Sequence, residues 1–196
     1  MTDNFKKLAQ RYYIEGNFKT ANLYYKQLDM PLEIAYCELF SGNLYKAKKY
    51  ISMLKKESPA EEWIICFIQM IEANLFDMPS FLQIRNFFEI DLNNLFLCGK
   101  KEWIENVINY VPVLSTVNAE IYKLTARVLK NNEQFELAKK FLLNSLDICF
   151  NDSETHFLLA EIYIKYGQIQ QARKHLQYAC EGGGYAPAEK LLRQFM

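Results

Sequence analysis

The sequence has little of what enzymes and metal proteins usually need. It contains only 2 histidines, and it has no HExxH, no CxxC pair and no GxGxxG pattern. The triplet Gly182-Gly183-Gly184 follows a helical pattern rather than a strand and precedes neither Lys-Ser nor Lys-Thr, so it is not a phosphate-binding loop. We therefore expect no enzyme activity, no metal and no cofactor in this chain.

Cysteine, export signals and long apolar runs are also scarce. The 5 cysteines are scattered, which is typical of buried thiols in a reducing compartment: Cys37, Cys66, Cys98, Cys149 and Cys180. The first residues, MTDNFKKLAQRYY, are polar and amphipathic, unlike a signal peptide. The longest uncharged run, residues 106–119, is too short to span a bilayer. We expect a cytoplasmic protein without membrane insertion.

Helix-breaking residues and net charge are low as well. Only 7 glycines and 5 prolines occur, while 51% of the residues are hydrophobic, so the chain can fold around a core. Lys plus Arg and Asp plus Glu are both 23, which leaves a net charge of zero. Such a balance gives no general attraction to nucleic acid, and we expect no nucleic-acid partner.

What the sequence does contain is a helical pattern that repeats. After Gly167, apolar and small residues follow at spacings of three, four and three, which marks one face of a helix: Ile169, Ala172, Leu176 and Ala179. The same offsets occur 34 residues earlier, with Glu133 in place of the hinge glycine. Weaker matches to the same pattern surround Gly16 and Gly42, and alanine recurs on both helices of each pair.

This two-helix unit resembles the tetratricopeptide repeat (TPR) family, which has a 34-residue period and a small residue on each helix. The resemblance covers residues 2–58 and 119–184, and residues 60–118 are a degenerate version. Tyr122 and His156 stand where the family often has tryptophan, and Gly184 stands where proline is usual. The junction EGGGYAPAE is also similar to Sel1-type repeats.

The resemblance implies an all-α fold, an α-solenoid in which about six antiparallel helix pairs stack into a right-handed superhelix. We expect a single domain over residues 1–196 with a capping helix over residues 186–196. The hinges fall at Gly16, Gly42, Asn74, Gly99, Glu133 and Gly167. A short helix is expected over residues 91–98, another over 101–111, and a loop over 112–117.

The most apolar segment is WIICFIQMI, residues 63–71. It predicts a central helix that is covered on nearly all sides, with an exposed groove or dimer face as the alternative. The two histidines lie on opposite helices of one repeat, and His156 occupies a core position, so we expect both to have structural or surface roles.

The resemblance also implies a concave surface formed by the first helix of each pair. The residues turned inward would be Tyr13, Leu32, Tyr36, Phe40, Ile68, Glu72, Asn93, Phe96, Lys123, Arg127, Lys130 and Glu161. An apolar groove beside basic residues suits an amphipathic helix or an apolar peptide. The family's carboxylate clamp needs lysine and asparagine on neighbouring first helices, but here Lys6 is followed by Gln10 and then by Glu33, so no clamp is expected.

We therefore expect a non-catalytic interaction module that binds a partner protein or peptide in its groove. One alternative is a cytoplasmic secretion or assembly chaperone that holds apolar segments of other subunits. A second alternative is a structural subunit that self-associates, as a homodimer, through its apolar central helices.

Overall fold

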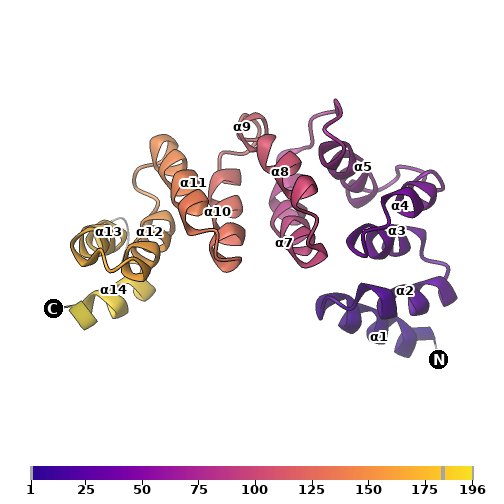
Figure 1. Ribbon diagram of the computed structural model, residues 1–196, viewed down its shortest axis with the longest axis horizontal. Helices are drawn as coiled ribbons and strands as arrows, with labels where there is room; N and C mark the ends of the chain where they lie inside the picture. The colour runs from indigo at the N-terminus through magenta and orange to yellow at the C-terminus, as the bar shows by residue number, and fades with distance from the viewer. Residues whose placement is uncertain (1, 182–183, 196) are drawn as a thin grey trace. The chain divides into compact units, whose positions relative to one another are not determined.

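The computed structural model describes residues 2–181 and 184–195, and all regular structure within these ranges is helical (Figure 1). Neighbouring helices lie antiparallel in pairs, so the expected all-α arrangement of stacked, TPR-like helix pairs is confirmed. Gly182, Gly183 and Met196, which belong to the expected glycine run and capping helix, lie outside the described residues. No helix in the described part of the chain is long and apolar enough to cross a membrane.

The chain forms two compact units, Met1–Tyr110 and Val111–Met196, which are called the N-terminal unit and the C-terminal unit below. The single domain expected from the sequence stays a prediction. In the N-terminal unit the helices are α1 (Thr2–Ile14), α2 (Phe18–Gln27), α3 (Pro31–Phe40), α4 (Leu44–Ile51), α5 (Pro59–Ile71), α6 (Phe81–Gln83), the π-helix η1 (Ile84–Phe88), α7 (Glu89–Cys98) and α8 (Lys101–Asn109).

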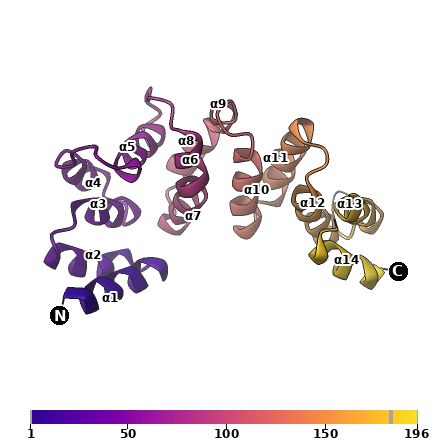
Figure 2. The ribbon, with the colours of Figure 1, turned by 180° about the vertical axis from the view of Figure 1, so that it is seen from behind.

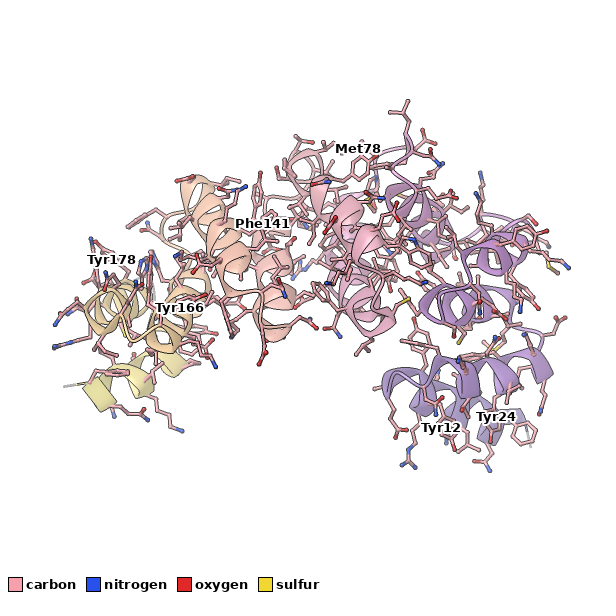
Figure 3. The ribbon with its side chains drawn as sticks, in the orientation of Figure 1. Tyr12, Tyr24, Met78, Phe141, Tyr166 and Tyr178 are labelled. Atoms are coloured by element: carbon pink, nitrogen blue, oxygen red, sulfur yellow. The ribbon has the colours of Figure 1, made fainter. Side chains whose placement is uncertain are left out.

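The first two helix pairs, α1 with α2 and α3 with α4, follow the expected pattern. Their crossing points hold alanines that are fully buried: Ala9, Ala21, Ala35 and Ala47. Gly16 turns between α1 and α2 at φ +74°, and a Cβ there would lie 3.2 Å from a methyl group of Leu97. The rings of Tyr12 and Tyr24 stack with centroids 5.8 Å apart (Figure 3). Small residues and a glycine turn thus let these helices approach closely.

Residues 81–98 form one helical run rather than two helices, which differs from the expectation of a short helix beginning at residue 91 (Figure 2). Ser80 and Gln83 form a capping box at its start, and no glycine or proline interrupts residues 81–98. Within this run, one π-helical turn, η1, joins α6 to α7. The hinge before this run is Ala73, at φ +54°, rather than Asn74.

Helix α5 is the core of the N-terminal unit. Trp63, Ile64, Phe67, Met70 and Ile71 are almost completely buried, and α5 packs against α8 and α6. Full burial of each such side chain contributes roughly 1.5–3 kcal/mol. The expectation of a central covered helix is confirmed, and because these side chains are buried within the chain, they offer no exposed groove or dimer face.

The C-terminal unit consists of α9 (Val111–Leu114), α10 (Ile121–Asn131), α11 (Phe135–Ile148), α12 (Ser153–Lys165), α13 (Ile169–Glu181), α14 (Ala186–Leu192) and the 3₁₀ turn η2 (Arg193–Phe195). The loop expected over residues 112–117 is wrong in its first half, because α9 is helical there. Glu133 takes φ +61°, so it replaces the hinge glycine in conformation as well as in position. Leu191, Leu192 and Phe195 pack against the core cluster of α12, α13 and α14.

Ala172 on α13 is fully buried, in the pair formed by α12 and α13. The substitution Ala172→Leu adds three carbon atoms where the two helices cross, and it should lower the free energy of unfolding by roughly 1–3 kcal/mol. Urea unfolding checks this value against Gln171→Leu, since Gln171 is the exposed neighbour on the same helix. Equal unfolding midpoints for the two variants would contradict the packing at this crossing.

Candidate binding pocket

A pocket of about 240 Å³ opens in the N-terminal unit between α1, α3 and the η1–α7 run. Tyr13, Leu32 and Tyr36, which the sequence pattern places on the inner surface, all line it. The structure brings them together with residues that the sequence analysis did not select: Tyr25, Glu33, Ala60, Phe87, Ile90 and Asp91. The lining of the pocket thus comes from α1, α2, α3, α5, η1 and α7.

Several other predicted groove residues do not reach this pocket. Phe40 and Ile68 are 2% and 4% exposed, so the prediction that they face a partner is wrong. Phe40 instead packs in the core against Phe18, with ring centroids 5.4 Å apart. Glu72 caps the end of α5 and forms an ion pair with Lys48 at 2.9 Å. Asn93 and Phe96 are half-buried on α7, outside the pocket lining.

The predicted basic group on α10 is neutralised by carboxylates of α12. Lys123 lies 2.9 Å from Asp152 and 3.2 Å from Glu154. Arg127 lies 2.7 Å from Glu154, and Lys130 pairs with Glu161. Since these side chains are partly buried, the pairs fasten α10 to α12. The prediction of a basic flank to the groove is therefore wrong, because the charges are compensated within the chain.

The pKa values in this network follow from the same contacts. Burial of Asp152 would raise the pKa of its carboxyl, but hydrogen bonds from Lys123 and Thr155 hold it below the usual value. Burial of Lys123 would lower its pKa, and the carboxylates of Asp152 and Glu154 raise it instead. Both groups therefore stay charged near neutral pH, which keeps the network intact.

Aromatic rings form much of the wall of the N-terminal pocket, and three of them pack against a further ring. Tyr13 contacts Phe18 edge to face, with ring centroids 5.3 Å apart. Tyr36 stacks on Phe40 at 6.0 Å, and Phe87 stacks on Trp63 at 6.1 Å. Because these contacts restrict the side chains before any partner arrives, the pocket is preformed.

A carboxyl group, that of Asp91, lies in the apolar surroundings of this pocket. Asp91 is 4% exposed and accepts a hydrogen bond of 2.7 Å from the Trp63 Nε1–H. Burial raises the pKa of Asp91 from 3.8 to about 7, and hydrogen bonds from Trp63 and Tyr36 oppose that rise. An acidic residue at a position flanked by Ile90 and Leu92, in the run FFEIDLNNLF, is the sequence signal that could have pointed to this site. Its burial depends on helices distant in the sequence.

A second polar cluster, in the C-terminal unit, joins the two histidines across α12 and α13. Their Nδ1 atoms are 2.9 Å apart, and the His156 Nε2 lies 2.7 Å from the carbonyl oxygen of Phe150. The His156 Nε2–H therefore donates to Phe150, and the His175 Nδ1–H donates to His156. Burial, and then the charges of His156 and Lys174, lower the pKa of His175 to about 4. This arrangement needs a neutral His156, whose Nδ1 is the acceptor, and the lowered pKa keeps His175 neutral near pH 7 as well.

Within residues 2–181 and 184–195, no group of three or more histidine, cysteine, aspartate or glutamate side chains is placed to hold a metal ion.

No family model matches this sequence, and no curated protein matches it. Among solved structures, the chain is similar to a chain of the APC/C hetero-tetramer Cut9-Hcn1, with 15% identity and a TM-score of 0.43 over 98% of this chain. This chain spans 42% of that one. It is also similar to the MamA RS-1 ArsTM double mutant, with 15% identity and a TM-score of 0.38, over 92% of this chain and 93% of that one. The fold assignment rests on the helix packing described above.

The raised pKa of Asp91 predicts how stability depends on pH. The folded carboxyl holds its proton up to about pH 7 and the unfolded one only to about 3.8, so folding takes up a proton between these values. Stability should therefore fall as the pH rises through this window. Asp91→Asn keeps an acceptor for Trp63 but cannot ionise, and it should be more stable than the parent at pH 8 by at most roughly 4 kcal/mol.

Urea unfolding at pH 4.5 and pH 8 measures this effect. Asp77→Asn serves as the matched control, because Asp77 is exposed in the same unit. The account is contradicted when Asp91→Asn and the parent chain lose stability equally between the two pH values.

The histidine pair predicts the opposite pH dependence for the C-terminal unit. The pKa of His175 is about 6.5 in the unfolded chain and about 4 in the folded chain, so between these values only the unfolded chain is protonated at this residue. The free energy of unfolding should therefore drop as the pH falls through this window. In His175→Asn, the amide N–H can still donate to His156 but does not titrate. Thermal unfolding at pH 5 and pH 7.5 should show a smaller loss for this variant than for the exposed-site control Gln177→Asn. Equal losses would refute the assignment.

Proposed function

We propose that the chain is a non-catalytic protein–protein interaction module, and that its N-terminal pocket receives a side chain of a partner segment. The observation that supports this function is the convergence of Tyr13, Leu32 and Tyr36 with Phe87 in one open, preformed pocket. Tyrosine side chains in partly desolvated hollows are frequent binding hot spots, because they provide a large contact area with few rotatable bonds.

Exposed apolar side chains continue from the pocket along α7. Ile90 lines the pocket and is 57% exposed, and Leu97, two helical turns later, is 60% exposed. Residues seven apart lie on the same face of a helix, so Ile90 and Leu97 form a strip beside the pocket. The predicted residue Asn93 lies between them on this face. A partner segment that inserts one side chain into the pocket would cover this strip with its neighbouring residues.

The finer version of this function, a chaperone for secretion or assembly, stays a prediction. A chaperone and a scaffold would use the same apolar surface. They differ in whether the partner is unstable without the chain.

Site-specific photo-crosslinking tests the proposed function. A benzophenone amino acid at position 90 should form a discrete adduct with a partner protein in native lysate, whereas the same group at exposed position 101 should not. Tyr36→Ala in the position-90 background should reduce the adduct about tenfold or more, as expected for a hot-spot residue.

Circular dichroism of the Tyr36→Ala variant provides the folding control, because unchanged helicity shows that a smaller adduct is not caused by unfolding. Leu32→Gln, which removes apolar contact at the half-exposed rim, provides a milder second variant. Equal adducts at positions 90 and 101, or full adduct yield in both folded variants, would place the binding surface elsewhere.

A further inference from the structure

The N-terminal pocket combines aromatic walls with two carboxyl groups that have no cation beside them in the described part of the chain. Asp91 and Glu33 both line it, and none of the ion pairs among the described residues involves either of them. Elsewhere in the same unit the buried carboxylate of Glu38 has a cation, Lys26, at 3.0 Å. A buried carboxyl without a cation is costly, so this pocket is suited to receive one from outside the chain.

We propose that this pocket binds the ammonium group of a lysine side chain of the partner segment, with Asp91 as its counter-charge and the rings of Tyr13, Tyr36 and Phe87 as its walls. This inference rests on the proposed function and specifies its chemistry. Cations over aromatic faces are attracted by the ring quadrupole, and the attraction grows when water is excluded. The carboxylate adds a charge-assisted hydrogen bond.

The shape of the pocket favours lysine over other occupants. Its volume of about 240 Å³ is below that of pockets for drug-sized ligands, about 300–1,000 Å³, and suits one side chain. Leu32 and Ile90 provide apolar contact for the methylene stem of lysine. Asp91 already accepts bonds from Trp63 and Tyr36, so a compact ammonium fits the remaining acceptor sites better than the bidentate fork of arginine.

A lysine within a protein segment fits the surroundings better than a free alkylamine does. The pocket is continuous with exposed Ile90, and Leu97 follows on the same face of α7. A free amine would leave this apolar strip uncovered, whereas residues flanking a lysine would bury it. Apolar neighbours on the partner therefore complete the match.

Binding of this kind is linked to pH. The pKa of Asp91 is raised to about 7, and a bound ammonium favours the carboxylate, so affinity should increase as the pH rises from 6 to 8. Two other titratable groups interact electrostatically with Asp91: Tyr13 on α1 and Tyr36 on α3. Tyr25 on α2 and Glu33 on α3 line the same pocket, and Cys37 on α3 lies close enough to Tyr13 to affect its pKa. Burial raises the pKa of Tyr25 and that of Cys37 to about 12, and it raises those of Tyr13 and Tyr36 as well, so these four stay neutral. From α5 the neighbours are Ala60 and Trp63, which do not titrate.

The test uses the full chain and two acetylated, amidated pentapeptides, Ala-Leu-Lys-Leu-Ala and its analogue with norleucine in place of lysine. The readout is the NMR signal of the Trp63 indole N–H, which donates to Asp91 and so reports the pocket directly. The chain has 2 tryptophans, and Trp103→Phe identifies the Trp63 signal. Pentylammonium serves as the free-amine probe.

The lysine peptide should shift the Trp63 signal and bind at least about tenfold more tightly than the norleucine peptide at pH 8, with the preference shrinking several-fold at pH 6. Asp91→Asn, which keeps an acceptor for Trp63, should lose both the preference and its pH dependence. Glu33→Gln should weaken the preference only in part. Glu105→Gln, an exposed carboxylate on α8, should change nothing.

Three results would overturn the inference: equal binding of the two peptides, a lysine preference that survives Asp91→Asn, or no shift of the Trp63 signal with either peptide. Pentylammonium binding as tightly as the lysine peptide would overturn the partner segment as the source of the amine. Equal binding of both peptides at Trp63 leaves the proposed function standing, whereas loss of the position-90 crosslink refutes the function itself.

Discussion

The hydrogen bond from the Trp63 indole to the Asp91 carboxyl, 2.7 Å long, is the contact on which the N-terminal unit depends. It joins α5, whose residues 63–71 form the core of the unit, to α7, which forms one side of the pocket. An indole N–H buried at the centre of the unit needs an acceptor, because an unsatisfied donor there would cost about 1–3 kcal/mol. Asp91 provides that acceptor, and in doing so it places an acidic group beside the rings of Tyr13 and Tyr36.

This arrangement combines structural and binding roles in one residue. An asparagine would satisfy Trp63 without the penalty of burying an ionisable group, so packing alone does not explain an acid at this position. A carboxyl that is half-ionised near neutral pH is instead matched to a cation supplied by a partner, whose arrival would remove the penalty. Unfavourable groups in a fold are expected where function needs them.

The repeating parts of the fold were predictable because they depend on local chemistry. Gly16 and Glu133 were correctly placed as hinges from the spacing of apolar residues, and both adopt positive φ. Most of the features that were missed depend on contacts between distant segments. The cations of α10 were predicted to be available, but stacking brings Asp152 and Glu154 of α12 against them. The burial of Asp91 likewise follows from packing against α5, which periodicity alone does not reveal. The continuous run of residues 81–98 has a local cause instead, since a capping box begins it and no glycine or proline interrupts it.

The central claim concerns the ionisation of one buried carboxyl group, and a direct titration tests it. The carboxyl carbon of Asp91 can be followed by NMR from pH 4 to pH 9, first in the free chain and then with the lysine pentapeptide. The account predicts a midpoint near 7 in the free chain and a lower midpoint in the complex. A midpoint near the ordinary aspartate value of about 3.9, or a midpoint that the peptide does not move, would contradict it.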